Sequence, residues 1–178
     1  MKKTISIIIS IAMCAMLASC GGVKNEVSDT EQPSLIDTMS LEEKVGQILF
    51  VRCVEDEQTD DLMSIKPGGI LMFGRDFEGL TKDEVKEKIQ SYQDKSDIPL
   101  IIGADEEGGT VVRVSSNPNL APEKFKSPQE IYNEGGMDAA VENATEKSEF
   151  LLSLGVNMNL APVADVSTNP SDYMYDRS

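Results

Sequence analysis

Short apolar runs alternate along the chain with segments whose apolar residues recur at helical spacing. Four nearly continuous apolar runs are typical of strands with both faces covered, namely 48–53, 69–73, 99–104 and 156–160. Helix-like segments separate them. This alternation predicts a parallel α/β sheet, because parallel neighbours need a crossover connection and the crossover is usually a helix.

Capping signals mark where the helices begin. Capping boxes, in which a hydroxyl side chain and a glutamate three residues later bond each other's backbone N–H, occur at 40–43 and 81–84. The second opens a predicted helix over 81–96. Another helix is predicted over 137–154, where apolar residues repeat at helical spacing and stop at Gly155.

The pattern leaves two parallel folds open, a doubly wound sheet and a (β/α)8 TIM-type barrel. A barrel of eight strands takes about 250 residues. Four strands are predicted in this chain of 178 residues. If the fold is a barrel, we therefore expect only about its first half here.

The N-terminus has the pattern of an export signal. Lys2 and Lys3 precede an apolar stretch over 5–17, and small residues lead to Cys20. Leu-Ala-Ser-Cys followed by two glycines resembles the bacterial lipobox, whose cysteine is acylated; an ordinary signal with an incidental cysteine is the alternative. We expect a signal peptide at 1–19, a lipid on Cys20 that anchors the exported protein to a membrane of the cell envelope, a flexible tether at 20–33, and a folded domain at 34–178.

Charge and composition exclude several classes of partner. The net charge of -15 would repel a phosphate backbone, so nucleic acid is not expected to bind. Once Cys14 leaves with the signal and Cys20 is acylated, Cys53 has no partner, so no disulfide is expected and Cys53 is predicted to be a small buried apolar residue. The chain has no histidine and its carboxylates are scattered, so no metal site and no cofactor are predicted.

Polar residues follow the second, third and fourth predicted strands, at the strand ends where parallel α/β folds bind their ligands. These residues are Gly74, Arg75, Asp76, Asp105, Glu106, Glu107, Gly108, Gly109, Arg113, Asp165, Asp176 and Arg177. Carboxylates accept hydrogen bonds and arginine donates them in a fixed fork, which suits a ligand with many hydroxyl groups. The glycine pair predicts a tight turn and not a phosphate loop, because no P-loop lysine accompanies it.

Five blocks resemble consecutive blocks of the N-terminal domain of glycoside hydrolase family 3. They are MSLEEKVGQI at 39–48, PGGILMFGRD at 67–76, PLIIGADEEGGTVVRV at 99–114, LGVNMNLAPVADV at 154–166 and DRS at 176–178, in the family's order and spacing. The resemblance implies a TIM-type barrel and hydrolysis of a terminal β-linked sugar by a β-N-acetylhexosaminidase or a β-glucosidase. An oligosaccharide or amino-sugar substrate is then the expected partner.

The resemblance also assigns roles to residues. It implies that Asp105 holds sugar hydroxyl groups and that Arg113 and Arg177 bind the sugar or its substituents, as in the hexosaminidase branch. Thr110 departs from the pattern, since many relatives have arginine there. The other residues have structural interpretations: Arg75 pairing with Asp76, Asp165 supporting the loop that carries Arg177, and Glu106 and Glu107 pointing in different directions, one of them structural and solvated and neither the catalytic acid.

The resemblance places the catalytic groups outside this sequence. Retaining glycosidases need a nucleophilic carboxylate and a separate acid/base. In this family they resemble an aspartate on a later strand and a histidine paired with an aspartate, and the 178 residues contain no histidine. We therefore expect no turnover by this chain alone. A sugar-binding lipoprotein and an inactive family 3 relic remain alternatives, and the coding sequence after Ser178 would distinguish them.

Overall fold

The computed structural model describes residues 34–175 and 177. The predicted signal peptide, Cys20 and the tether lie outside these residues. The chain divides into two compact units, Met1–Asp37 and Thr38–Ser178. The described part of the first unit holds the start of a short helix, α2 (Leu35–Thr38), and everything below concerns the second unit.

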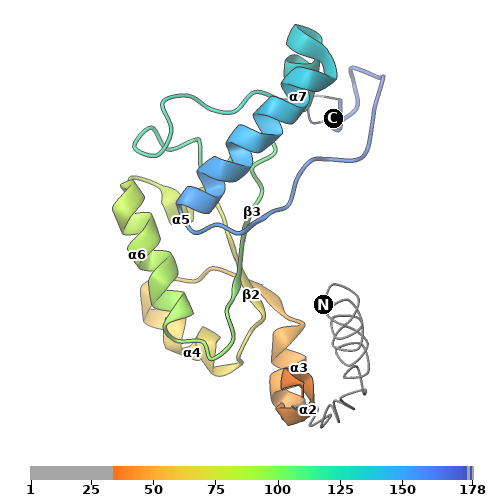
Figure 1. Ribbon diagram of the computed structural model, residues 1–178. Coiled ribbons are helices and arrows are strands. Elements are labelled where there is room, and N and C mark those ends of the chain that lie inside the picture. Colours follow the sequence, from red (N-terminus) through yellow and green to blue (C-terminus); the bar gives the residue numbers. More distant parts are fainter. Residues whose placement is uncertain (1–33, 176, 178) are drawn as a thin grey trace, which may run out of the picture. The chain divides into compact units, whose positions relative to one another are not determined.

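A parallel sheet of four strands forms the centre of the second unit (Figure 1). The strands are β1 (Phe50–Arg52), β2 (Gly69–Met72), β3 (Ile101–Ala104) and β4 (Met158–Asn159). They lie in chain order, β1-β2-β3-β4, and each neighbouring pair is parallel. All four predicted strands are therefore confirmed. The order does not reverse within the described sheet, as it would at the switch point of a doubly wound fold, so it follows a barrel.

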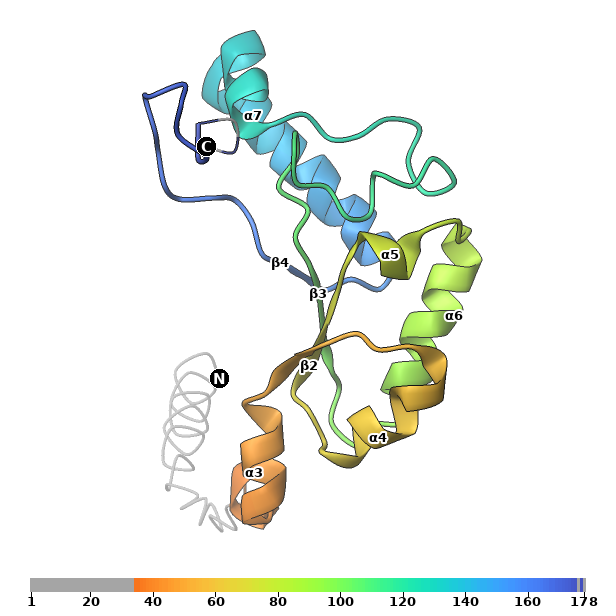
Figure 2. The ribbon, with the colours of Figure 1, turned by 180° about the vertical axis from the view of Figure 1, so that it is seen from behind.

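Helical segments make the crossovers between strands. They are η1 (Asp56–Gln58) and α4 (Thr59–Ser64) after β1, α5 (Gly74–Phe77) and α6 (Lys82–Gln93) after β2, and α7 (Pro128–Ser153) after β3. A further helix, α3 (Leu41–Gln47), precedes β1. Figure 2 shows α4 and α6 on one side of the strands and α7 crossing above them. No helix among the described residues is long and apolar enough to cross a membrane.

The predicted capping boxes are present. At α3 the Ser40 hydroxyl accepts from Glu43 N–H at 3.2 Å, and the Glu43 carboxylate accepts from Ser40 N–H at 2.8 Å. Lys66 also donates to Glu43 at 2.6 Å, and with the Ser40 N–H it lowers the pKa of Glu43 to about 2. Thr81 and Glu84 repeat the reciprocal arrangement at α6. The local sequence thus fixes where these two helices begin.

Helix α7 is longer than predicted. It begins at Pro128 after a third capping box, formed by Ser127 and Glu130. Gly136 has a φ of 66°, so the helix is interrupted there, and the predicted segment 137–154 is its second part. The end is as predicted, because Gly155 has a φ of 92° and follows the capping residue.

The hydrophobic core lies between the sheet and the helices. The predicted stripe of α6 is buried, with Val85, Ile89 and Tyr92 all packed in this core. Cys53 joins them as a free buried thiol, 3.2 Å from the Tyr92 hydroxyl, and burial raises its pKa. The prediction of a small buried apolar cysteine is confirmed.

The opposite face of the sheet is organised around one aromatic ring. The Phe50 ring lies over two glycines, Gly69 on β2 and Gly103 on β3. A Cβ at Gly69 would be 2.6 Å from this ring, and one at Gly103 would be 2.5 Å from it. Phe50 and Ile101 remain about 40% exposed, at 39% and 42%. Glycine is therefore required at these two strand positions, so that the large Phe50 side chain can lie across this face of the sheet.

Candidate sugar-binding site

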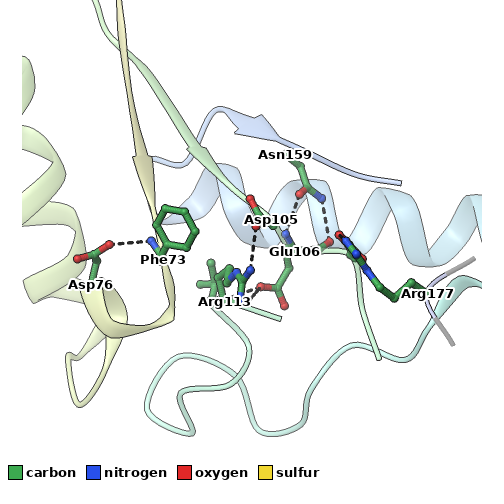
Figure 3. A network of polar contacts seen from close by, with 9 residues as sticks. Phe73, Asp76, Asp105, Glu106, Arg113, Asn159 and Arg177 are labelled. Atoms are coloured by element: carbon green, nitrogen blue, oxygen red, sulfur yellow. Dashed lines mark hydrogen bonds and ion pairs between the residues drawn. The ribbon is translucent and has the colours of Figure 1, made fainter. Parts of the chain in front are cut away.

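Polar side chains gather at the carboxyl ends of β2, β3 and β4 (Figure 3). Asp105 directly follows β3, and the loop after it returns so that Arg113 Nη2 donates to Asp105 Oδ2 at 2.9 Å. The side chains of Arg113 and Asp105 are 30% and 21% exposed, so both reach the surface of the site. Two of the three predicted sugar ligands therefore contact each other directly.

Arg177 comes to the same place from the far end of the chain. Its Nε donates to Glu107 Oε2 at 3.0 Å, and its Nη2 donates to Glu107 Oε1. These bonds raise the pKa of Arg177 above its ordinary value. All three predicted residues, Asp105, Arg113 and Arg177, are thus attached to the segment that follows β3.

Glu106 takes part in neither ion pair and holds the loop. It is completely buried, and its carboxylate accepts from the backbone N–H groups of Arg113 and Val114 at 2.7 Å and of Ser115 at 3.3 Å, and from the Ser115 hydroxyl. The prediction that adjacent Glu106 and Glu107 point in different directions is confirmed. The prediction that one is solvated is wrong, because Glu107 is only 4% exposed and forms the ion pair with Arg177.

Two residues that sequence reasoning missed support this segment. Asn159, on β4, accepts from Glu106 N–H at 2.9 Å and donates to Glu106 O at 3.0 Å, which joins the ends of β3 and β4. Lys147 of α7 is 8% exposed and donates to Glu107 O at 2.7 Å; burial lowers its pKa. Lys147 gave no signal as an isolated lysine in a polar helix, whereas Asn159 is a polar residue within the predicted strand 156–160.

The glycine pair makes the predicted tight turn. Gly108 and Gly109 have φ values of 102° and 64°, and Gly108 bridges back to Val111. A Cβ at Gly108 would lie 2.1 Å from Lys126 O. The turn therefore needs glycine both for its backbone conformation and for space.

Phe73 forms an apolar wall beside the carboxylates. The guanidinium groups of Arg52 and Arg113 lie 4.8 and 5.5 Å from the centre of its ring. Asp76 accepts from Phe73 N–H at 2.7 Å, which fixes the backbone at the end of β2. Arg75 pairs with Asp76, as predicted, at 3.6 Å and also donates to Cys53 O at 3.3 Å.

The predicted supporting role of Asp165 stays a prediction. Its side chain is exposed, and it makes no hydrogen bond or ion pair with any residue that the structure describes. The segment after β4 leaves the sheet and runs outward before it returns (Figure 1).

The geometry suits binding of hydroxyl groups better than acid–base chemistry. In the described part of the chain, no group of three or more histidine, cysteine, aspartate or glutamate residues is placed to hold a metal ion. Asp105 accepts from Arg113 through one oxygen only, whereas both Glu107 oxygens accept from Arg177. A carboxylate beside guanidinium groups and an aromatic wall is an arrangement that binds polyhydroxylated ligands.

Comparison with known proteins decides the family. The sequence profile of the glycosyl hydrolase family 3 N terminal domain matches residues 40–178. The chain belongs to this family. The match begins at Ser40, the cap of α3, and includes all four strands.

Curated relatives and a solved structure agree with this assignment. Beta-hexosaminidase A of Pseudoalteromonas piscicida is 32% identical over 108 residues, which are 59% of this chain and 18% of that protein. A beta-hexosaminidase of Haemophilus influenzae is 25% identical over 113 residues, 64% of this chain and 32% of that protein. The chain thus spans about a fifth to a third of the length of these relatives.

The structural likeness confirms the partial barrel. A family 3 β-N-acetylglucosaminidase from Paenibacillus sp. str. FPU-7 superposes with a TM-score of 0.65 at 27% identity, over 74% of this chain and 26% of that one. The family 3 assignment and the barrel-type fold, of which four strands are present, are therefore both confirmed.

Proposed function

We propose that this chain supplies the sugar-binding side of the active site of a β-N-acetylhexosaminidase that removes terminal β-linked N-acetylhexosamine from an oligosaccharide. The observation that carries the proposal is the attachment of Asp105, Arg113 and Arg177 to one segment at the end of β3. The names of the relatives support the sugar, since they are beta-hexosaminidases and a β-N-acetylglucosaminidase.

The chemistry of binding follows from the donors and acceptors that remain free. Asp105 Oδ1 accepts sugar hydroxyl groups, and the exposed edges of Arg113 and Arg177 donate to hydroxyl or acetamido oxygens. Phe73 offers an apolar surface next to them. Charge-assisted hydrogen bonds therefore bind the pyranose along one edge.

Hydrolysis needs two further groups. A retaining glycosidase uses a nucleophile and an acid/base on opposite sides of the scissile bond. Among the described carboxylates at the site, Asp105 and Glu107 are paired with arginines, and Glu106 is buried in the loop. None of the three is placed to attack a sugar carbon, so catalysis requires residues beyond those described.

An activity profile tests this function. The complete product of the gene that contains this sequence should hydrolyse nitrophenyl β-N-acetylglucosaminide at least about 10-fold faster, in kcat/KM, than nitrophenyl β-glucoside, because the acetamido group adds about one hydrogen bond to a charged group. Residues 21–178 alone should show no turnover. Turnover by residues 21–178, or no hydrolysis of any β-linked sugar by the complete product, would contradict the proposal.

A sugar-binding lipoprotein, or an inactive family 3 relic, is the second candidate. It is favoured by the pairing of Glu107 and the burial of Glu106, which leave Asp105 as the one described carboxylate after β3 with an oxygen free for ligand. A stop codon directly after Ser178 would favour these candidates. A continuing reading frame with a histidine-bearing loop and a later aspartate would favour the enzyme.

We also propose that the protein is exported and anchored to a membrane of the cell envelope by acyl chains on Cys20. The lipobox-like Leu17–Cys20 sequence and the basic, apolar start support this proposal. The wild-type protein should enter the detergent phase on Triton X-114 partitioning after signal removal. A Cys20→Ala variant should lose lipid labelling, and labelling that persists in this variant would exclude Cys20 as the acylated residue.

A further inference from the structure

The oxygens of Glu107 accept three hydrogen bonds, two at its carboxylate and one at its backbone carbonyl, and these leave no space for a sugar. Both carboxylate oxygens accept from Arg177, one at 3.0 Å from Nε and the other from Nη2. Its backbone carbonyl accepts from Lys147 at 2.7 Å. Its side chain is 5% exposed. Glu107 therefore has no free oxygen with which to bind a hydroxyl group or to attack a sugar carbon.

The same contacts fix the orientation of Arg177. A guanidinium group bonded side-on through Nε and one Nη can no longer rotate about its terminal bonds. The Tyr173 ring lies 5.2 Å from the guanidinium carbon and restricts the group further. The Arg177 side chain is 21% exposed, so Glu107 and Tyr173 do not cover it completely.

The neighbouring ion pair behaves differently. Asp105 accepts from Arg113 through one oxygen only, and its side chain is 21% exposed. Asp105 can therefore give an oxygen to a ligand while it stays paired. The two carboxylates are two residues apart on one segment, yet one meets the ligand directly and the other acts only through an arginine.

We propose that Glu107 is a positioning residue that holds the Arg177 guanidinium in the orientation in which its remaining N–H groups bind the acetamido or hydroxyl oxygen of the sugar at Asp105. This inference rests on the proposed function. The contribution of Arg177 to sugar affinity then depends on Glu107. It also assigns a glutamate beside the binding site to a role distinct from acid–base catalysis.

A double-mutant cycle in the complete gene product tests the dependence. Glu107→Gln should raise KM for nitrophenyl β-N-acetylglucosaminide about 10-fold and leave kcat within about twofold, because a neutral amide weakens the hold on Arg177. In an Arg177→Ala background, Glu107→Gln should change KM less than about twofold, since the group that Glu107 orients is gone. The matched control Glu149→Gln, an exposed glutamate on α7, should change neither constant.

Two results would overturn the inference. Equal effects of Glu107→Gln with and without the Arg177 side chain would mean that Glu107 acts on the fold as a whole. A fall in kcat at unchanged KM would mean that it acts on the chemical step. If Glu107→Gln does not fold, Glu107→Asp replaces it, because aspartate keeps the charge but its shorter side chain holds the Arg177 guanidinium less well and should give a rise in KM in the same direction.

A second measurement separates this inference from the proposed function. In the NMR spectrum of the complete product, the Nε–H signal of Arg177 should be protected from exchange with water and should lose that protection in Glu107→Gln. This holds whether or not the protein hydrolyses any sugar. An unprotected signal in the wild-type protein would refute the orientation, whereas a protected signal in a protein without activity would refute only the proposed function.

Discussion

Asp105→Asn should lower kcat/KM for nitrophenyl β-N-acetylglucosaminide by about 100-fold in the complete gene product, because a hydrogen bond to a charged group contributes about 1.5–3 kcal/mol and the carboxylate makes more than one of them. Asparagine keeps one acceptor oxygen and replaces the other with a donor. That donor would face either Arg113 Nη2 or the sugar hydroxyl groups. Titration calorimetry with N-acetylglucosamine should show a matching loss of affinity.

Asp165→Asn is the matched control for this variant. Asp165 also follows a strand, but its side chain is exposed and makes no hydrogen bond or ion pair with the residues that the structure describes. The same chemical change there should leave kcat/KM within about twofold. If Asp105→Asn retained wild-type activity and affinity, Asp105 would not be a sugar ligand, and the proposed binding site would be wrong.

Glu106→Gln should destabilise the protein by about 3 kcal/mol, the result of leaving buried donors without an acceptor. The carboxylate of Glu106 is completely buried and accepts from three backbone N–H groups and the Ser115 hydroxyl. A glutamine would point an NH₂ group at some of these donors. Urea unfolding followed by circular dichroism should show a lower midpoint with an unchanged slope.

Glu149→Gln serves here as the control for charge removal alone. Glu149 is exposed on α7, so its replacement should change the free energy of unfolding by less than about 0.5 kcal/mol. Equal stability of Glu106→Gln and Glu149→Gln would show that the loop from Asp105 to Ser115 does not depend on the buried carboxylate.

The strands were predictable from the sequence pattern in number but not in length. The run 156–160 predicted a longer strand than Met158–Asn159, the extent of β4. Two residue pairs join β4 to β3, Gly103 with Met158 and Ala104 with Asn159. Only Val156 of this run is buried, and a strand ends where its ladder of hydrogen bonds ends, so the observed strand is shorter than the run.

Sequence by itself determined the features that depend on residues close together in the chain. The capping boxes at Ser40 and Thr81 act over three residues, and the strand-to-helix alternation follows from side-chain periodicity, so both are visible without a structure. The position of Asp105 at the end of a strand is a local feature as well. The family resemblance added the expected roles of the residues that follow the strands.

Only the tertiary structure decided which carboxylate does what. Asp105, Glu106 and Glu107 are consecutive acidic residues, and no local rule distinguishes a ligand-facing one from a buried one. The pairing of Glu107 with Arg177 joins residues 70 apart in the chain. Such contacts depend on how the loops return to the sheet, because the fold sets which charges meet and which donors need an acceptor.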